Sequence, residues 1–159
     1  MNSDVEWMQE ALAEAESAAD AGEVPVGAIV LLNDEVIGRG QNRVLRDLDP
    51  TAHAEIVAIR AAAKHLNNYR LTGCELYVTL EPCAMCAGAM IHARIQRLIY
   101  AAADPKAGAA GSVLEVLNHP RLNHQMQLTV GVLAEPAGEI LRQFFRRKRE
   151  QGSAIKDES

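Results

Sequence analysis

The chain centres on the segment Thr79-Leu80-Glu81-Pro82-Cys83-Ala84-Met85-Cys86, where an apolar, strand-like run ends and two cysteines follow three residues apart. Pro82 suits the first position of a helix, because its missing N–H and restricted φ cost nothing there. On a helix, residues i and i+3 share a face, so both sulfurs can point at one ion. The sequence therefore predicts a strand-to-helix junction that presents two thiol ligands.

A lone Cys-x-x-Cys is compatible with a zinc knuckle, a redox dithiol or coincidence, and a redox dithiol also sits at the start of a helix after a strand. The segment His53-Ala54-Glu55 separates these readings, because it supplies a second element of metal-site chemistry. A structural zinc site is closed by four protein ligands, whereas three ligands leave a position for water. Cys74 stands apart at the start of a strand, so we predict a catalytic zinc site held by His53, Cys83 and Cys86.

The spacing of His53 and Glu55 restricts where they lie, since residues i and i+2 point to different faces of a helix. Both can serve one site only if His53 is at the helix N-terminus. The same position favours Cys83 as a thiolate, because the helix dipole is positive there. Zn²⁺ with two thiolates and a neutral imidazole carries no net charge and acidifies its water less than an all-histidine site. A nearby base is then more valuable, and Glu55 is predicted to carry the proton.

Composition indicates one globular domain over residues 1–150 of the 159-residue chain. No apolar run approaches the roughly 20 residues that span a bilayer, and no basic segment followed by a hydrophobic stretch begins the chain. We therefore expect no membrane partner. An odd number of cysteines argues for a reducing compartment, so we expect a cytoplasmic protein. The net charge of −5 argues against nonspecific adhesion to nucleic acid, although a basic cluster occurs near the C-terminus, at Arg142 and residues 146–149.

Periodicity and turn signals predict an α/β fold. Ser3 and Glu6 form a capping box before the first helix, and Asn33-Asp34 suggests a hairpin. Two strand–helix–strand crossovers, over 75–102 and 97–132, imply parallel pairing, so we expect a mixed, mostly parallel central sheet of about five strands in a three-layer α/β/α arrangement. The predicted helices are 4–20, 54–65, 82–91, 112–117 and 136–149; the predicted strands are 24–32, 36–38, 75–80, 97–102 and 127–133. Residues 151–159 are expected to be a disordered tail.

His-x-Glu followed by Pro-Cys-x-x-Cys resembles the signature of the zinc-dependent cytidine and nucleobase deaminase superfamily. Four segments, 49–55, 68–71, 77–91 and 106–112, closely resemble the bacterial tRNA-specific adenosine deaminase family, and the similarity extends over residues 5–149. The resemblance implies a cytidine-deaminase-like fold, one Zn²⁺ per subunit and a homodimer. Ala107 departs from the family pattern, in which threonine often follows the lysine.

The resemblance also implies a reaction, the hydrolytic deamination of adenosine to inosine at the wobble position of a tRNA anticodon. Zinc-bound hydroxide would attack C6 of the adenine, Glu55 would shuttle the proton, and ammonia would leave. The expected contacts to the base are the backbone near Ala54 and Cys83, a hydrogen bond from Asn42, and Val26 in the pocket wall. The expected contacts to the flanking anticodon nucleotides are Asp104, Lys106, Asn123 and Phe145.

Other readings stay open at this point. The chain is also compatible with a deaminase of a free base or nucleoside, such as cytidine or guanine, or with a non-catalytic, zinc-stabilised RNA-binding domain. Asn42 could merely cap a strand end, and Phe144 and Phe145 could both belong to the core. The basic run 146–149 could be a solvated helix face. We expect His92, His119 and His124 to be structural.

Overall fold

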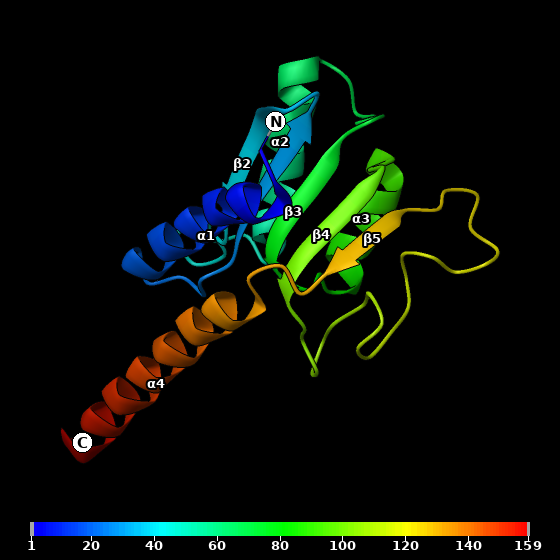
Figure 1. Cartoon of the computed structure of the whole chain (residues 1–159). Coiled ribbons are helices and arrows are strands. Elements are labelled where there is room, and N and C mark those ends of the chain that lie inside the picture. Colours follow the sequence, from blue (N-terminus) through cyan, green and yellow to red (C-terminus); the bar gives the residue numbers. More distant parts are fainter. Residues whose placement is uncertain (1, 159) are drawn as a thin grey trace.

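A single five-stranded sheet forms the middle of the molecule, and the computed structural model describes residues 2–158, with side chains over 2–152 (Figure 1). The strand order is β2-β1-β3-β4-β5. In chain order the elements are α1 (Asp4–Asp20), β1 (Gly27–Leu32), β2 (Glu35–Gln41), α2 (Ala54–Leu66), β3 (Glu75–Leu80), α3 (Ala84–Ala93), β4 (Arg97–Ala102), β5 (Gln127–Val130) and α4 (Ala134–Glu158).

Strand direction confirms the predicted mixed sheet. β1 runs antiparallel to both of its neighbours, β2 and β3, whereas β3–β4 and β4–β5 are parallel pairs. Four of the five strands therefore point the same way, and only β1 is reversed. The parallel half of the sheet is the half that is joined by the crossovers through α3 and through the long connection before β5.

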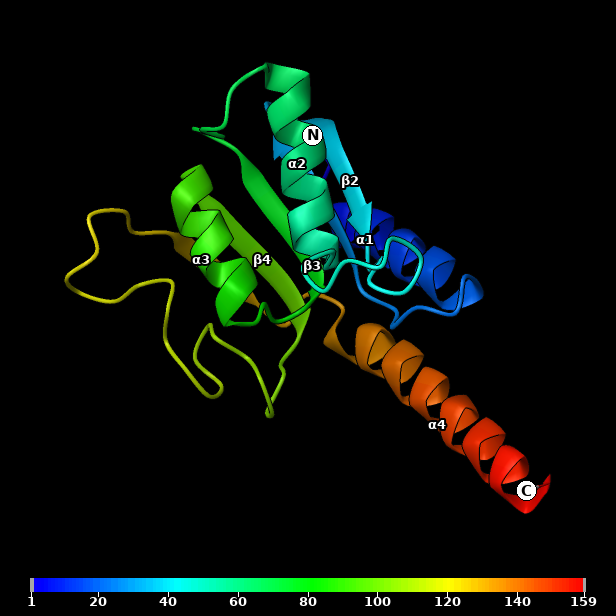
Figure 2. The same cartoon turned by 180° about the vertical axis from the view of Figure 1, so that it is seen from behind.

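Helices cover both faces of the sheet, which confirms the predicted three layers. α2 and α3 lie together on one face (Figure 2), and α1 and the start of α4 lie on the other (Figure 1). Side chains alternate between the two faces along each strand, as the pleat requires. One core thus contains Val30, Val78 and Leu98 with the inner sides of α2 and α3. The second core contains Ile29, Tyr77 and Ile99 with Trp7, Met8 and Ala137.

Glycines let α2 lie unusually close to β2. A Cβ at Gly38 would overlap the backbone of Ala58, and a Cβ at Gly40 would overlap the carbonyl oxygen of Ala54. The strand therefore contacts the helix backbone directly, from the N-terminal turn of α2 at Ala54 to Ala62. This close approach fixes the height of His53 and Glu55 above the sheet.

Two predicted helical features are wrong. Residues 112–117 form no helix; Ala110 and Glu115 instead make an isolated β-bridge, and Gly111 takes a φ of +122°. Pro82 is not the first helical residue, because α3 begins at Ala84 with Cys83 as its N-cap. The carbonyl of Pro82 accepts a hydrogen bond from the N–H of Ala109, 2.8 Å away, and this keeps Pro82 in the connection.

Several predicted boundaries also move. The second strand, predicted over 36–38, extends over Glu35–Gln41, and the last helix begins at Ala134 rather than at residue 136. The first strand begins at Gly27 rather than at residue 24, and the last ends at Val130 because Gly131 has a φ of +81°. The last helix continues to Glu158, so the structure places residues 151–158, predicted to be a disordered tail, in α4. Gly152 is the one residue over 150–158 that strongly disfavours a helix, and no proline interrupts the run. No helix within residues 2–158 is long and apolar enough to cross a membrane.

Candidate active site

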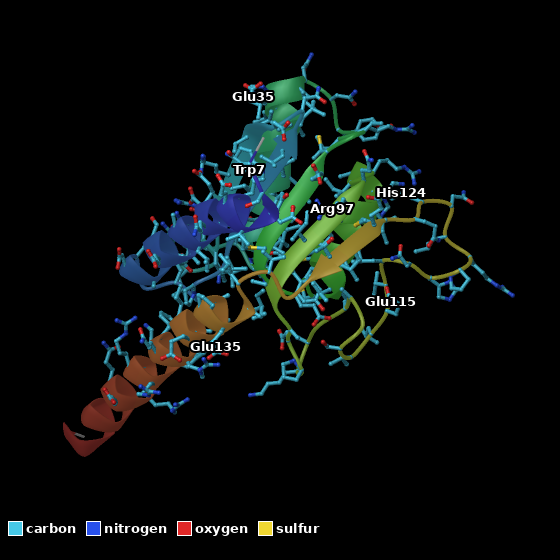
Figure 3. All side chains as sticks on the ribbon, viewed as in Figure 1. Trp7, Glu35, Arg97, Glu115, His124 and Glu135 are labelled. Atoms are coloured by element: carbon cyan, nitrogen blue, oxygen red, sulfur yellow. The ribbon has the colours of Figure 1, made fainter. Side chains whose placement is uncertain are left out.

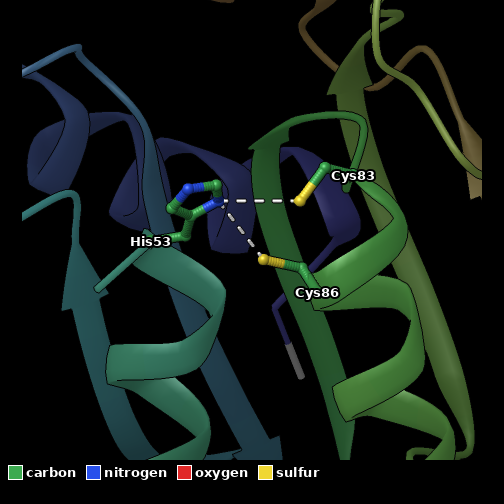
Figure 4. Close-up of side chains that lie close together, drawn as sticks. All are labelled: His53, Cys83 and Cys86. Atoms are coloured by element: carbon green, nitrogen blue, oxygen red, sulfur yellow. Dashed lines mark hydrogen bonds between the residues drawn. The ribbon is translucent and has the colours of Figure 1, made fainter. Parts of the chain in front are cut away.

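Three candidate metal ligands meet where α2 and α3 begin. His53 is the N-cap of α2 and Cys83 the N-cap of α3, while Cys86 lies in the first turn of α3. The Nδ1 atom of His53 is 3.6 Å from Sγ of Cys83 and 3.5 Å from Sγ of Cys86 (Figure 4). All three ligand atoms lie within 4.8 Å of one another. The two helix N-termini, far apart in sequence, therefore present one convergent set of donors.

The donor set fits Zn²⁺ by geometry and by chemistry. A tetrahedral site with Zn–S of about 2.3 Å and Zn–N of about 2.0 Å has N···S edges of roughly 3.5 Å, as found here. Imidazole and thiolate are the donors that zinc prefers, and three of them leave a fourth position for water. Cys74, Cys83 and Cys86 are all free thiols, so no disulfide competes for the sulfurs.

Hydrogen bonds from its two neighbours favour the thiolate form of Cys83. Hydrogen bonds from the thiol of Cys86 and from His53 lower the pKa of Cys83 to about 3, against the opposing effect of burial. The pKa of His53 is raised, chiefly by the same hydrogen bond to Cys83. The pKa of Cys86 is raised because its thiol donates a hydrogen bond to the thiolate of Cys83 and because the side chain is buried.

Glu55 lies beside these ligands and is almost completely buried, with 4% of its surface exposed. Burial raises the pKa of this carboxyl to about 7, although a backbone hydrogen bond and the charge of His53 act in the opposite direction. A carboxyl with such a pKa can both accept and donate a proton near neutral pH.

A small cavity of about 260 Å³ opens over this group. Pockets for drug-sized ligands usually hold about 300–1,000 Å³, so the space suits a group of the size of one base rather than a folded RNA segment. Four of the predicted substrate contacts, Val26, Asn42, Ala54 and Asp104, line it together with Glu55 and two of the candidate ligands. The remaining lining residues are Val24, Leu80, Glu81 and Ala107.

Three other predicted contacts lie outside this cavity. Lys106 and Phe145 line a separate groove of about 610 Å³, whose other residues are Leu141, Arg142, Arg146, Lys148 and Arg149 of α4. Phe145 is 44% exposed, whereas Phe144 is buried, so only one of the pair belongs to the core. Asn123 lines a third cavity with Arg94, the C-cap of α3. It therefore lies toward the end of α3 opposite to Cys83.

Sequence reasoning missed two buried carboxylates that hold the loops around the cavity. Glu23 accepts hydrogen bonds from the backbone N–H groups of Leu45 and Arg46, at 3.0 and 2.9 Å. Glu81 does the same for the loop after β4, through the backbone of Asp104, Ala110 and Ser112. An acid at the end of an apolar run, with no cation nearby in sequence, was the available signal for Glu81.

These hydrogen bonds also lower the pKa values of the two carboxyl groups. Burial alone would raise the pKa of Glu81, but the donors from Ser112, Asp104 and Ala110 lower it below the usual value. The pKa of Glu23 is lowered in the same way, because the amides and guanidinium of its loop outweigh burial. Both groups are therefore charged anchors near neutral pH.

Comparison with known proteins gives the class to which this fold and site belong. The model of the MafB19-like deaminase family matches residues 2–149, so the chain is a deaminase-family protein. Among curated relatives, the tRNA-specific adenosine deaminase of Haemophilus influenzae is 49% identical over 150 residues, covering 93% of this chain and 86% of the relative. That of Bacillus subtilis is 42% identical over 156 residues, covering 98% and 97%. The chain belongs to the tRNA-specific adenosine deaminase family.

Solved structures agree with this assignment. A chain from structural work on A-to-I editing by tRNA:A34 deaminases superposes with a TM-score of 0.83 at 46% identity, covering 86% of this chain and 99% of the other. The guanine deaminase of Nitrosomonas europaea shares the fold with a TM-score of 0.79 at 25% identity, covering 91% and 85%. The fold is thus common to deaminases of different bases.

Proposed function

We propose that this chain converts adenosine to inosine at the wobble position of a tRNA anticodon. The observation that carries the proposal is the convergence of His53, Cys83, Cys86 and buried Glu55 on one small cavity, in a chain of this family. The sizes of the cavity and of the groove beside α4 support an arrangement in which one base enters the cavity and the rest of the loop stays outside.

The three converging side chains would hold Zn²⁺. When bound there, the ion activates a water molecule for attack on the carbon that carries the amino group. The role of the protein would be to supply two thiolates and an imidazole from one cluster, which the helix N-termini support because their dipoles favour negative charge.

Glu55 would move the protons of the reaction. Its carboxylate would accept a proton from the attacking water, and its carboxylic acid would pass a proton to the amino group, which then leaves as ammonia. Burial raises the pKa of this carboxyl to about 7 in the absence of the ion, and a cation held by the neighbouring ligands would favour the carboxylate, the form that takes the first proton. Burial also keeps bulk water from competing for the carboxyl oxygens.

Contacts to the substrate fall into two groups. Val26, Asn42 and Ala54 would surround the adenine, with Asn42 as its hydrogen-bond partner. Asp104, Lys106 and Phe145 would contact the flanking nucleotides, and the cations of α4 beside them suit the phosphates of the loop. The proposed contact from Asn123 would be to a part of the RNA farther from the bound base, because this residue lines another cavity.

We also propose that the chain acts as a homodimer in the cytoplasm. Leu128 and Val130 are exposed on the edge strand β5, and Met85 is 37% exposed at the start of α3, so apolar surface is available for a second copy. Free thiols fit a reducing compartment. Sedimentation of the purified protein would show a mass of about two chains if the dimer exists.

The decisive experiment measures inosine in an anticodon stem-loop and ammonia in parallel. Wild-type protein loaded with zinc should produce both in equal amounts, while the same protein treated with a chelator should produce neither. Zinc content and RNA affinity without any ammonia would instead support a non-catalytic RNA-binding domain.

A free-base deaminase is the second candidate, because a guanine deaminase of Bacillus subtilis is 42% identical over 70% of this chain with a TM-score of 0.63. The groove of cations beside the cavity favours RNA over a free base. Incubation with guanine, cytidine and adenosine as separate substrates discriminates between the two, since the RNA enzyme should release ammonia from the stem-loop alone.

A further inference from the structure

One carboxylate holds the whole loop over residues 104–112, which forms one wall of the cavity. Glu81 is 2% exposed. Its Oε1 accepts a hydrogen bond from the N–H of Asp104 at 3.0 Å, and its Oε2 accepts from Ala110 and Ser112 at 3.0 and 3.1 Å. The hydroxyl of Ser112 donates a further short hydrogen bond to Oε1. Four donors spread along the loop thus converge on a single side chain.

The loop also lies directly against this carboxylate and the residue after it. A Cβ at Gly108 would overlap the carboxyl group of Glu81, so only glycine allows this approach. Ala109 donates its N–H to the carbonyl of Pro82 at 2.8 Å. Glu81 and Pro82 immediately precede Cys83, so the segment that delivers a metal ligand is the segment that holds the loop.

Further hydrogen bonds within the loop fix the positions of residues that line the cavity and the groove beside α4. Oδ1 of Asp104 accepts from the N–H groups of Lys106 and Ala107, at 3.0 and 3.2 Å. Asp104 and Ala107 line the cavity together with Glu81, and Lys106 lines the groove beside α4. Glu81 therefore connects the segment that carries the candidate ligand Cys83 to the loop at the mouth of the cavity.

We propose that Glu81 is a positioning residue, which sets the 104–112 loop relative to the ligand cluster and thereby determines how well the cavity takes a nucleotide held in an RNA loop. This inference rests on the proposed function. Glu81 takes no part in proton transfer here; it acts through the positions of Asp104 and Lys106. Its loss should weaken binding of the stem-loop and leave the chemistry of a bound base largely intact.

The direct test is Glu81→Gln, in which an amide NH₂ replaces one of the two accepting oxygens and faces N–H donors. We expect KM for the anticodon stem-loop to rise about tenfold and kcat to change less than about threefold, the pattern of lost binding rather than lost chemistry. Zinc content should equal that of the wild type. Hydrogen exchange at the amides of Ala110 and Ser112 should become faster. Glu115→Gln is the matched control. Glu115 is an exposed acid on the same connection (Figure 3), and its carboxylate accepts a hydrogen bond from the N–H of Asn118, so all four readouts should be unchanged.

Two further variants approach the same contact from the loop. Gly108→Ala leaves Glu81 intact but pushes the loop away from it, so it should reproduce the rise in KM. Ser112→Ala removes one donor and should cause a smaller rise, which decides the question if Glu81→Gln does not fold. Absence of inosine with the wild type would reject the proposed function and with it this role. Wild-type activity with unchanged KM in these variants, or a loss of zinc that accounts for their lower activity, would overturn the positioning role alone.

Discussion

Glu55 joins deep burial to a position in the first turn of α2, beside two candidate metal ligands. We predict that Glu55→Gln binds zinc normally but forms inosine about 10²–10⁴ times more slowly, because a carboxamide cannot exchange protons. Zinc content and single-turnover inosine formation are the measurements. Glu35→Gln, at an exposed position of β2, is the control. Turnover within tenfold of the wild type would rule out Glu55 as the proton carrier.

Cys86 is fully buried, and its sulfur is 3.5 Å from His53. We predict that Cys86→Ser loses zinc, because a hydroxyl is a poor substitute for a thiolate ligand. Chelation should then lower the melting temperature of the wild type and leave that of the variant unchanged. Cys74→Ala is the matched control, since it removes a buried thiol outside the cluster and should retain zinc. Full zinc occupancy in Cys86→Ser would refute the assigned ligand set.

At the scale of elements, the contact between β2 and α2 places the site. Gly40→Ala should lower the free energy of unfolding by about 1–3 kcal/mol, because the new methyl group meets the carbonyl oxygen of Ala54 and the helix must move. The same shift would displace His53 and Glu55, so activity should fall as well. Urea unfolding and inosine formation test both effects.

Gly88→Ala provides the comparison within α3. A Cβ at Gly88 meets no atom within 4 Å, so this substitution should stabilise the protein by about 0.5–1 kcal/mol through helix propensity. Equal effects of the two substitutions would show that the close approach of β2 to α2 is unimportant.

Element prediction from sequence succeeded where local patterns agreed with packing. The capping box at Ser3 and Glu6 is formed in the structure, and His53 and Cys83 lie at helix N-termini as their spacing required. Residues 112–117 failed as a helix because the N–H of Val116 donates to the carbonyl of Ala109 instead of to that of Ser112, in a loop that Glu81, about thirty residues away in sequence, holds in place through the N–H groups of Ala110 and Ser112. No local pattern contains that long-range competition.

Across the whole molecule, one charged network ties the first helix to the sheet. Arg97 of β4 (Figure 3) bonds Asp4 of α1 at 2.5 Å and Glu75 of β3 at 2.8 Å. Thr129 of β5 accepts from the same guanidinium, and the hydroxyl of Tyr77 donates to Asp4 at 2.6 Å. The hydrogen bond from Arg97 is the main reason that the pKa of Asp4 is lowered from 3.8.

This shift predicts how stability depends on pH. Since the pKa of Asp4 is lower in the folded state, its contribution is fully present above the unfolded pKa of 3.8 and is lost as pH falls through the folded value. Asp4→Asn should therefore lower the unfolding free energy by about 1–3 kcal/mol at pH 7, and the difference from wild type should shrink below pH 3.8. Urea unfolding over this range, with Glu16→Gln on α1 as control, measures it. A difference that does not vary with pH would contradict the assignment.

The sequence by itself determined the fold class and predicted the chemistry. Two local patterns carry that prediction, because each depends on residues only two or three positions apart. One is the pair Cys83 and Cys86 at helical spacing, and the other is His53 and Glu55 at a second helix start. The tertiary structure alone decided which distant segments share the site: it brought Asp104 into the cavity with Glu55, put Lys106 and Phe145 in a neighbouring groove, and left Asn123 at the other end of α3. It also revealed Glu81 as the anchor of the 104–112 loop. The four donors of this loop come within hydrogen-bond distance of Glu81 only because β3 and β4 pair.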